Sequence, residues 1–574
     1  MALGQTGPDG PRFQDVPIHD QFDADKNGRL DREERQLARE ALSNMERPTR
    51  RHRPGMGETI EDSVRPQDNP DQIKLTNDDV LHFKDKGLYD IDALHTLFIE
   101  FPEADWHDEL VEFHGTDAEV PATLIIDGET IGEVGVSYRG NTSFDFPEKK
   151  SFGISIDAYD DDLRLKGYKT LNLLNANGDP SLMREVLFPN IAGEYLPAPK
   201  ANFVKVVVNG TYLGLYGNIQ QINKEFTQEN WGSKKGVRWK VPPDFSGDGA
   251  LRYLGDDIEP YKDSYELKTG SAEDSDWEKL VELCRVLKQT PDEQLEEVLP
   301  KYLDVDEVIW FLALDNVFMD SDGYYSRGSD YYLYKDEDDV FHLVHYDNNE
   351  TFGDTGRRRG RGGRGGRGGP GGPGGPGGPG GPMDQGSFGP PSNEQEMIKE
   401  FDTNGDGQLS EIELRAFHEK MRQQRDEMGG RGDRGGRGGR GGRRGRGGDV
   451  MTQPPLAFEN EMDIRPLVVR ILAVKQWRDL YLERVKLLAM EELDWEKLGG
   501  RIAVWRTLIA EDIEQDPFLN GRTSFEASLD GPNQSLKTNA EQRRKFLLEH
   551  ESFHPAISDD NPKTIEVEDA LPVQ

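Results

Sequence analysis

Alternating apolar and polar positions predict a β-rich region in the first half of the chain. Residues 121–138 contain two β-branched runs on either side of an Asp-Gly pair, which predicts a hairpin. A second hairpin is predicted over 203–217, where FVKVVV and TYLGLYG flank Asn-Gly. Between the hairpins, residues 150–157 read as a third strand. The Asp-Pro pair at 179–180 predicts a helix start, because Asp caps helices and Pro fits the first position.

The next regular segment begins with a continuous apolar pattern. Residues 305–319 (VDEVIWFLALDNVFM) predict a mostly buried helix, and the Asp-rich loop 320–330 follows it. Residues 331–346 then predict two strands around DEDD. His342 and His345 lie three residues apart in the second strand and therefore face opposite sides of it. This spacing argues against a metal site shared by these two histidines.

Helical patterns return near the end of the chain. Residues 455–552 predict three or four helices, with breaks near Gly499-Gly500 and Asn520-Gly521. Together with the hairpins upstream, these helices indicate a mixed α+β architecture.

Two Gly-rich tracts divide the sequence, because they contain almost nothing that can be buried. We predict the following segments: an EF-hand at 11–47, a main domain at 80–355, a linker at 356–390, an inserted EF-hand at 391–428, a linker at 429–450, a helical continuation at 451–552 and a tail at 553–574.

Composition narrows the range of partners. The formal net charge is −38, which repels nucleic acid and attracts divalent cations. The Arg-Gly tracts resemble RNA-binding segments, but the acidic remainder favours a linker role, so we expect no nucleic-acid partner. The single cysteine, Cys284, excludes an intrachain disulfide and a cysteine-built metal site. No stretch is apolar enough to predict a membrane span. We also expect the protein to be a monomer.

Two segments have the ligand spacing of a calcium-binding EF-hand loop. Oxygen ligands recur at loop positions 1, 3, 5, 7, 9 and 12, with a glycine at position 6 for the sharp turn. The first loop offers Asp23, Asp25, Asn27, Arg29 (through its carbonyl), Asp31 and Glu34; the second offers Asp402, Asn404, Asp406, Gln408 (through its carbonyl), Ser410 and Glu413. The sequence therefore predicts two Ca²⁺ sites.

The two hands are expected to pair with each other. Each is one helix–loop–helix unit, too small to bury its own apolar face. Both loops carry leucine at position 8, Leu30 and Leu409, where paired hands form a short strand contact. We therefore predict one small all-α domain assembled from the N-terminal and the inserted hand.

The aspartates after the predicted helix suggest phosphoryl transfer. Such a site needs a cation on the nucleotide phosphates, a carboxylate for the metal and another near the acceptor hydroxyl. Helix 305–319, loop 320–330 and the hairpin ending at Asp347 follow the order of helix, catalytic loop, two strands and metal aspartate in protein kinases. This order makes Asp322 and Asp347 candidate site residues.

Several spaced motifs resemble one family. They are TLIIDGETIGEVGVSYRGNTSFDFPEKKSF, GDPSLMRE, VNGTYLGLYGNIQQINKEF, DSDGYYSRGSDYYLY and HLVHYDNNETFG. Together they resemble the CotH family of bacterial spore-coat and related secreted proteins, which are assigned as atypical protein kinases. The resemblance runs from about 80 to 352 and resumes over 455–550. It implies a two-lobed kinase-like domain with a helical C-terminal part.

The resemblance also implies residue roles. Asp347 would bind Mg²⁺ or Mn²⁺ with ATP, and Asp322 would be the catalytic aspartate. The implied nucleotide-binding residues are Arg139, Lys149, Lys150, Glu185 and Gln220, of which Lys150 is preferred over Lys149 and Glu185 would be its partner. Family members commonly carry glutamate where this chain has Gln220 and asparagine where it has Asp330, which can still bind metal.

Two functions lead at this stage, and a third, a nucleic-acid-associated protein that uses its Arg-Gly tracts, would require salt-sensitive RNA binding that survives deletion of the folded domains. The first is an ATP-dependent kinase acting on serine or threonine of protein substrates. The second is a noncatalytic, calcium-binding surface or matrix protein on a degenerate kinase fold, which Gln220 favours. The resemblance favours an extracellular or cell-surface location. The start MALGQTGPDGPRF lacks the apolar stretch of a signal peptide, which leaves the cytoplasm as the alternative.

Overall fold

The structure, a computed structural model, describes the chain in segments. The described residues are 16–44, 72–140, 143–144, 149–176, 178–243, 247–269, 272–353, 456, 464–519 and 521–553. The chain divides into two units, 1–361 with 448–574 and 362–447, and all described residues belong to the first. The inserted hand and both Gly-rich linkers lie outside the described residues.

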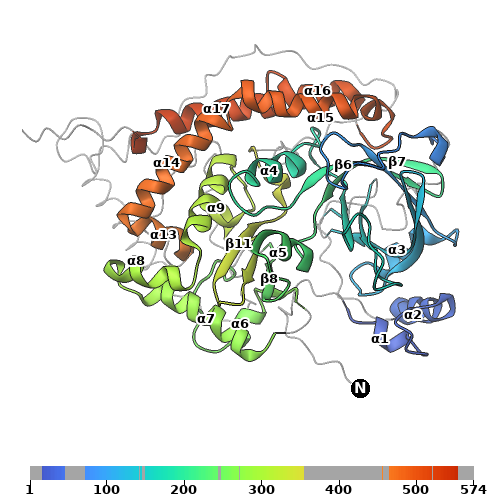
Figure 1. Cartoon of the computed structure of the whole chain (residues 1–574), viewed down its shortest axis with the longest axis horizontal. Coiled ribbons are helices and arrows are strands. Elements are labelled where there is room, and N and C mark those ends of the chain that lie inside the picture. Colours follow the sequence, from blue (N-terminus) through green and yellow to red (C-terminus); the bar gives the residue numbers. More distant parts are fainter. Residues whose placement is uncertain are drawn as a thin grey trace, which may run out of the picture. The chain divides into compact units, whose positions relative to one another are not determined.

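A closed β-barrel forms the first half of the described fold (Figure 1). Neighbouring strands follow the order β1-β2-β3-β4-β5-β7-β6, and a parallel pairing of β1 with β6 closes the ring. The bounds are β1 His95–Glu100, β2 Val120–Ile126, β3 Glu129–Arg139, β4 Ser151–Ser155, β5 Thr170–Leu174, β6 Ala201–Val208 and β7 Thr211–Ile219. Both predicted hairpins and the third strand are present.

Strands β6 and β7 are buried on both faces. Val204 and Val206 point into the barrel core, whereas Phe203 and Leu215 join the core formed with α4 (Arg184–Ala192) outside the barrel. This second face ties the barrel to the rest of the fold.

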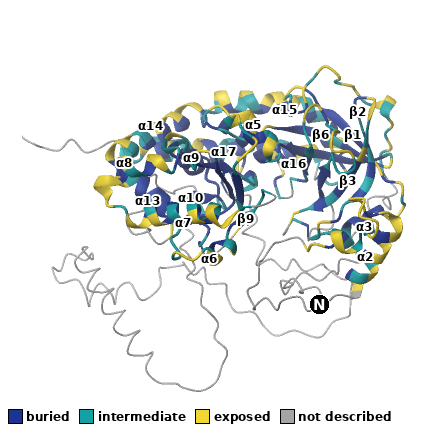
Figure 2. Cartoon of the chain, turned by 60° about the horizontal axis from the view of Figure 1, so that its bottom comes forward, coloured by how far each residue is buried: buried dark blue, intermediate teal, exposed yellow. Residues whose placement is uncertain are grey.

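A four-stranded sheet in the order β11-β10-β8-β9 forms the second half. Its strands are β8 Val237–Val241, β9 Glu266–Leu267, β10 Tyr331–Lys335 and β11 Phe341–His345. Alternation sends Leu333 and Leu343 to the face covered by α9 (Val305–Phe318), and Tyr332 and Val344 to the face covered by α5 (Lys224–Trp231). Figure 2 shows the buried strands between helices whose outer faces are exposed.

Helices complete the second half. The C-terminal ones are α13 Pro466–Ala473, α14 Lys475–Glu491, α15 Trp495–Gln515, α16 Gly521–Asp530 and α17 Leu536–Glu549, of which α14 packs on α9 and α15 on β7. The others are α6 Glu259–Lys262, α7 Asp274–Gln289, α8 Leu295–Val298 and α10 Tyr324–Arg327, with short 3-10 turns at Asn77–Asp79, Asp292–Gln294, Leu299–Lys301, Asn348–Glu350 (η6) and Glu551–Phe553. Within the described residues, no helix is long and apolar enough to cross a membrane.

Three details of the predicted helices were wrong. The described part of 455–552 has five α-helices rather than three or four, because Val474 separates α13 from α14. The break expected at Gly499-Gly500 is absent, because α15 runs through it and buries Leu498 and Ile502 on either side. The actual break precedes Trp495, where the Asp494 side chain caps the new helix. Helix α4 begins at Arg184 rather than directly after Pro180, since Asp179 bonds the Ser181 and Arg184 amides across an intervening turn.

The architecture is mixed α and β, as predicted. Its first half is the closed barrel, which the sequence patterns did not predict. The expected two-lobed kinase arrangement is not confirmed.

The N-terminal hand packs on the barrel. Its helices are α1 (His19–Phe22) and α2 (Arg32–Asn44), and α2 lies against α3 (Trp106–Phe113), as Figure 1 shows. The residues that form this apolar contact are Ile18, Leu30, Ala38 and Leu42 of the hand and Trp106, Leu110 and Phe113 of α3. Helix α3 therefore covers the apolar face for which a second hand was expected. Pairing with the inserted hand stays a prediction.

One buried ion pair fixes this docking. Arg35 Nε donates to Glu109 Oε1 at 2.7 Å, and the two side chains are 5% and 4% exposed. Arg35 follows the last calcium ligand, Glu34, and also donates to the Leu30 carbonyl of the loop. Arg35 thus connects α3 to the calcium loop at two points: at Leu30, through its carbonyl, and at Glu34, which precedes Arg35 in the chain.

We predict that Glu109→Gln destabilises this docking. Breaking a buried ion pair leaves an uncompensated charge and costs about 3–5 kcal/mol. Hydrogen exchange of the α2 amides should accelerate, and the calcium affinity of the loop should fall. Glu112→Gln is the matched control, because Glu112 lies on the same helix, pairs with Arg39 and is 44% exposed. A surface pair is worth about 1 kcal/mol or less. Equal effects of the two substitutions would contradict the assignment.

Candidate functional site

Acidic side chains from four segments gather where the second sheet meets α4. The loop after α9 supplies Asp320 and Asp322, and the start of β10 supplies Asp330. Asp347 follows β11, and Glu185 lies in the first turn of α4. Asp320, Asp330 and Glu185 are 6% exposed or less. The loop geometry requires left-handed backbone at Asp330 (φ 53°) and Asp347 (φ 57°).

Glu185 and Asp347 are neighbouring acidic groups. Burial, followed by the charges of Asp347 and Asp320, raises the pKa of Glu185 well above its ordinary value. Burial also raises the pKa of Asp347, although Lys240 opposes this shift. Two adjacent buried carboxyl groups cannot both ionise without a cation. The sequence had suggested Glu185 as a partner for a lysine, but its partner in the structure is Asp347.

Asp330 and Asp320 are also unfavourable anions here. Burial, then the charge of Asp347, raises the pKa of Asp330 well above its ordinary value. Burial and Asp315 raise the pKa of Asp320 in the same direction, although Asp320 Oδ1 accepts the amides of Asp322 and Gly323 at 3.2 Å. Asp320 therefore also shapes the loop, the local role common for aspartate in turns.

Asp322 lies nearer the surface of the cluster. Its carboxylate pairs with Arg327 of α10. Burial and the charge of Glu350 raise the pKa of Asp322 to about 6, against the effect of Arg327. Glu350 in turn accepts the Ser321 hydroxyl. Asp322 thus lies between a cation that pairs with it, Arg327, and a like charge that repels it, Glu350.

Two cations act on Asp347, and the sequence had identified one of them. Arg139 ends β3 and donates to Asn172 Oδ1 at 2.6 Å. Lys240 of β8 lies opposite Tyr332 in the sheet and 4.3 Å above the Tyr346 ring. Burial lowers the pKa of Lys240, but Tyr346, Tyr332, Asp347 and Asp330 outweigh burial and raise it. Lys240 was missed, because only the pairing of β8 with β10 brings it to the aspartates.

The two lysines expected at the phosphates have other partners. Lys149 Nζ donates to Asp516 Oδ2 at 2.8 Å and to the Leu215 carbonyl at 2.6 Å. Lys150 Nζ donates to the Phe144 carbonyl and lies 4.3 Å from the Phe144 ring. The two side chains point in different directions, as neighbours entering a strand do. Their contact with phosphate stays a prediction.

Gln220 also has local partners. Its Nε2 donates to Glu229 Oε2 at 2.9 Å, and its Oε1 accepts the Lys200 amide at 3.1 Å. Glu229 lies on α5, so the Gln220 amide ties the end of β7 to that helix.

The donor chemistry of the acidic cluster fits a hard divalent cation. Glu185 Oε1 and Asp330 Oδ1 are buried and have no hydrogen-bond partner among the described residues. Carboxylate oxygens are the ligands that Mg²⁺ and Mn²⁺ prefer, usually with water and phosphate oxygens completing the sphere. Within the described segments, three donor atoms lie within 4.8 Å of one another at Asp23, Asp25 and Glu34 and at Asp304, Glu307 and His342. The carboxylates around Asp347 do not form such a close group, so water or phosphate oxygens would have to complete the coordination there.

The first calcium loop is closed around its ligands. Asp23 accepts the Asn27 amide at 3.1 Å and the Gly28 amide at 2.9 Å, and Gly28 adopts φ 79°, which favours glycine. The Glu34 carboxylate accepts the Ala24 amide at 2.7 Å and the Asp31 amide at 2.9 Å, so it spans the loop. This arrangement fits Ca²⁺. The second loop, from Asp402 to Glu413, lies outside the described residues.

The fold and these two acidic centres define a mixed α and β protein with an EF-hand-type calcium loop and a second, buried acidic cluster. Residues 136–389 match the model of a family described as CotH kinase protein, and residues 20–34 and 395–418 match that of the EF hand. The CotH match covers less than half of the chain and agrees with the family resemblance of the sequence, and the EF-hand matches fall at both predicted places. A search among curated proteins found no match.

We predict that Asp330→Asn stabilises the metal-free protein and weakens its response to Mg²⁺. Asparagine keeps the shape but cannot ionise, so it removes the cost of burying a carboxyl group whose pKa is raised by burial and by Asp347; relief of such a cost commonly contributes about 0.5–2 kcal/mol. Thermal unfolding in EDTA should shift to higher temperature, whereas the rise caused by added Mg²⁺ should shrink. Lower stability in EDTA together with an undiminished Mg²⁺ response would refute the reading of Asp330 as a metal ligand.

Proposed function

We propose that this protein transfers the γ-phosphoryl group of ATP to serine or threonine hydroxyls of protein substrates. The observation that carries the proposal is the cluster of buried carboxylates around Asp347, with Arg139 and Lys240 beside it, within the region that matches the CotH kinase family. Phosphoryl transfer relies on positioning and on electrostatic stabilisation, which this combination of charges suits.

Each residue has a role in this proposal. Asp347 and Asp330 would hold Mg²⁺ or Mn²⁺, which would neutralise charge on the phosphates. Asp322 orients the acceptor hydroxyl and takes its proton. Arg139 and Lys240 face the phosphates. Glu185 lies beside Asp347, where it would orient that carboxylate.

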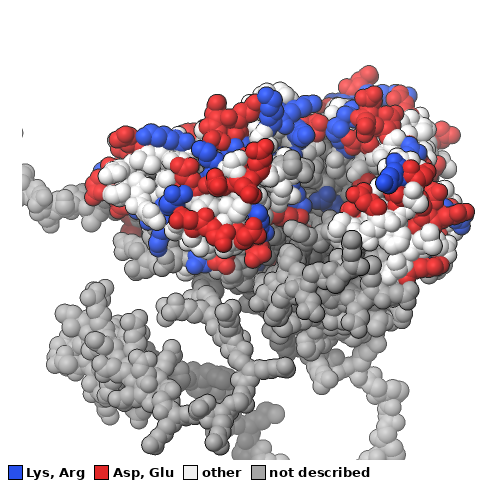
Figure 3. All heavy atoms as spheres, turned by 90° about the horizontal axis from the view of Figure 1, so that it is seen from below, with Lys and Arg blue, Asp and Glu red and all other residues white. Residues whose placement is uncertain are grey.

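The surface suits a basic substrate segment. On the face in Figure 3, acidic side chains spread over the described surface with lysines and arginines between them. With a net charge of −38, the protein attracts basic segments over long range. An extracellular or cell-surface setting belongs to this proposal, since millimolar calcium there suits EF-hand modules of low affinity.

A second candidate is a noncatalytic calcium-binding scaffold. The engagement of Lys149 with Asp516 and of Gln220 with Glu229 favours it, because both side chains serve the fold in the described structure. The two candidates differ in one observable, the ATP-dependent labelling of a protein substrate.

We predict that Asp347→Ala abolishes labelling from γ-labelled ATP, because it removes the central metal ligand. Asp322→Asn should lower kcat by about 10²–10⁴-fold, the usual contribution of a positioned proton acceptor, while ATP affinity stays nearly unchanged. Labelling with a generic basic protein and equilibrium binding of ATP with Mg²⁺ measure the two effects.

The control for this pair is Asp338→Ala. Asp338 lies in the exposed turn between β10 and β11 and should leave both quantities unchanged. Wild-type labelling in Asp347→Ala would reject the kinase proposal, and absence of labelling in the wild type would favour the scaffold.

For calcium, we propose two sites that couple through pairing of the N-terminal and the inserted hand. We predict that Glu34→Gln weakens calcium binding at its own loop by about tenfold or more, since it removes the bidentate ligand. Coupling should also weaken the Asp402 loop, and Glu413→Gln should act reciprocally. Calorimetry on both variants measures this. Two sites that ignore each other's substitution would mean that the hands do not pair, in keeping with the cover that α3 already gives the first hand.

A further inference from the structure

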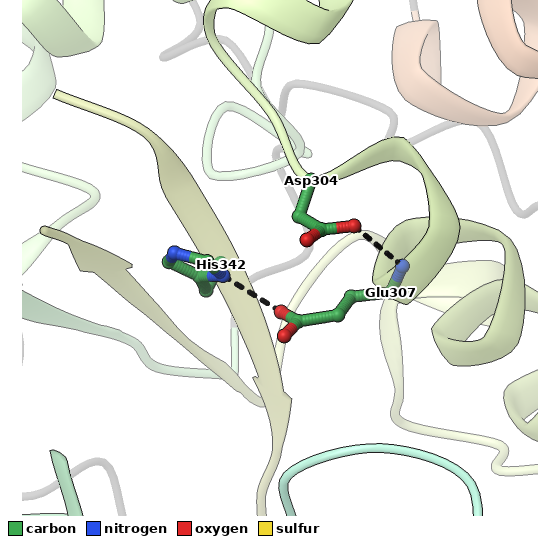
Figure 4. A group of neighbouring side chains, drawn as sticks. All are labelled: Asp304, Glu307 and His342. Carbon is green, nitrogen blue, oxygen red and sulfur yellow. Dashed lines mark hydrogen bonds and ion pairs between the residues drawn. The ribbon is translucent and has the colours of Figure 1, made fainter. Parts of the chain in front are cut away.

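A histidine and two carboxylates meet at the edge of the second sheet, far from the acidic cluster. One ligand atom each from Asp304, Glu307 and His342 lies within 4.8 Å of the others (Figure 4). Asp304 and Glu307 belong to the start of α9, whereas the acidic cluster follows its end. A helix of 14 residues is about 21 Å long, so the two groups are separate sites.

Backbone pairing brings these side chains together. Leu303 forms a parallel bridge with Phe341 at the edge strand β11, and the Phe341 amide donates to the Tyr302 carbonyl at 2.8 Å. This pairing sets Asp304 beside His342. Asp304 Oδ1 then caps α9 by accepting the Glu307 amide at 3.0 Å, which turns Glu307 toward the same place.

The orientation of His342 resembles that of a metal-ligating histidine. Its Nδ1 lies 2.7 Å from Glu307 Oε2, on the side of the two carboxylates. Its Nε2 lies 3.4 Å from Asp336 Oδ2, so a third carboxylate holds the opposite nitrogen. Metal-bound histidines usually donate their other ring N–H to such a group, which fixes the tautomer.

Aromatic neighbours hold the ligands in place. The His342 ring packs against Trp231 and Tyr334, with ring centroids 4.9 Å and 5.8 Å away. Trp231 Nε1 also donates to Glu307 Oε1 at 3.2 Å, which leaves Oε2 directed at His342. Preorganised ligands lose little entropy on binding.

The local charge favours a cation. Asp304, Glu307 and Asp336 surround one imidazole. The neighbouring basic side chains pair elsewhere, Lys335 with Asp276 and Asp339, and Arg484 with Asp306. In the metal-free protein, protonation of His342 can supply the positive charge that these carboxylates favour.

We propose that Asp304, Glu307 and His342 bind a divalent transition-metal ion such as Zn²⁺. The ion takes the place of the proton on His342 Nδ1, which is released to solvent, and water completes the coordination. Imidazole nitrogen and carboxylate oxygen are both ligand types that zinc takes in proteins, and imidazole favours transition metals over Mg²⁺ and Ca²⁺. The bound ion clips the first turn of α9 to the edge strand β11.

Cobalt provides the test, because Co²⁺ reports its ligands by visible absorption. The full chain, with its EF-hands filled by millimolar Ca²⁺ and without nucleotide, is titrated with Co²⁺ and then with Zn²⁺ as competitor. We expect one Co²⁺ per chain with the strong absorption of a low-coordinate, nitrogen-containing site, displaced by Zn²⁺. His342→Gln should abolish that absorption.

Asp304→Asn separates ligation from structure. Asparagine caps a helix as well as aspartate does, so stability without metal should be unchanged. Loss of the ligand charge should nevertheless lower the Co²⁺ affinity at least about tenfold, and Asp336→Asn should lower it about 10- to 100-fold. Wild-type affinity in both Asp304→Asn and Glu307→Gln would overturn the proposal.

Two controls locate the ion. His82→Asn removes an exposed histidine that bonds the Asn77 carbonyl, and it should leave the absorption unchanged. Asp347→Asn alters the oxygen-only cluster and should also leave it unchanged. Loss of the absorption in either control would place the ion elsewhere and reject the site.

Discussion

The burial of several like charges around Asp347 is the constraint on which the second half of the fold depends. Asp320, Asp330 and Glu185 are nearly inaccessible, and the cations that act on Asp347 are Lys240 and Arg139. At low local dielectric, such a group cannot hold all its charges without protons or a divalent ion. The helices, strands and loops that position these carboxylates must therefore hold them in place against their mutual repulsion.

The scaffold meets this demand with hydrogen bonds to backbone carbonyls. From α4, Arg184 donates to the carbonyls of Thr351 and Gly353, just after Asp347. From α17, Asn539 donates to the Phe352 carbonyl, and the buried Arg543 donates to Asn316 at the end of α9. The C-terminal helices thus fasten both aspartate loops, although more than a hundred residues of sequence separate them from those loops. These contacts agree with the grouping of the described C-terminal helices in one compact unit with the upstream residues.

Local signals in the sequence predicted the local features of this protein. The hairpins follow from Asp-Gly and Asn-Gly turns, and the first calcium loop follows from ligand spacing. Features set by distant contacts were missed. Lys240 acts on Asp347 only because β8 pairs with β10, and Lys149 looks like a free cation until Asp516, 367 residues away, is placed beside it. Likewise, Gly499-Gly500 costs a helix about 1 kcal/mol per glycine, which the burial of Leu498 and Ile502 outweighs.

Helix α9 and strand β11 both contribute to two proposed cation sites of different ligand chemistry. At their far ends they lead to Asp320 and Asp347, an oxygen-only cluster, and at their near ends they meet through Asp304, Glu307 and His342. Oxygen ligands suit abundant Mg²⁺, whereas imidazole favours scarcer, more tightly held transition metals. A single helix and strand can therefore carry both ions without competition between them. An ion at the near end would restrain the same helix whose far end positions the aspartate loop, so the proposed clip would stabilise the geometry that the proposed phosphoryl transfer requires.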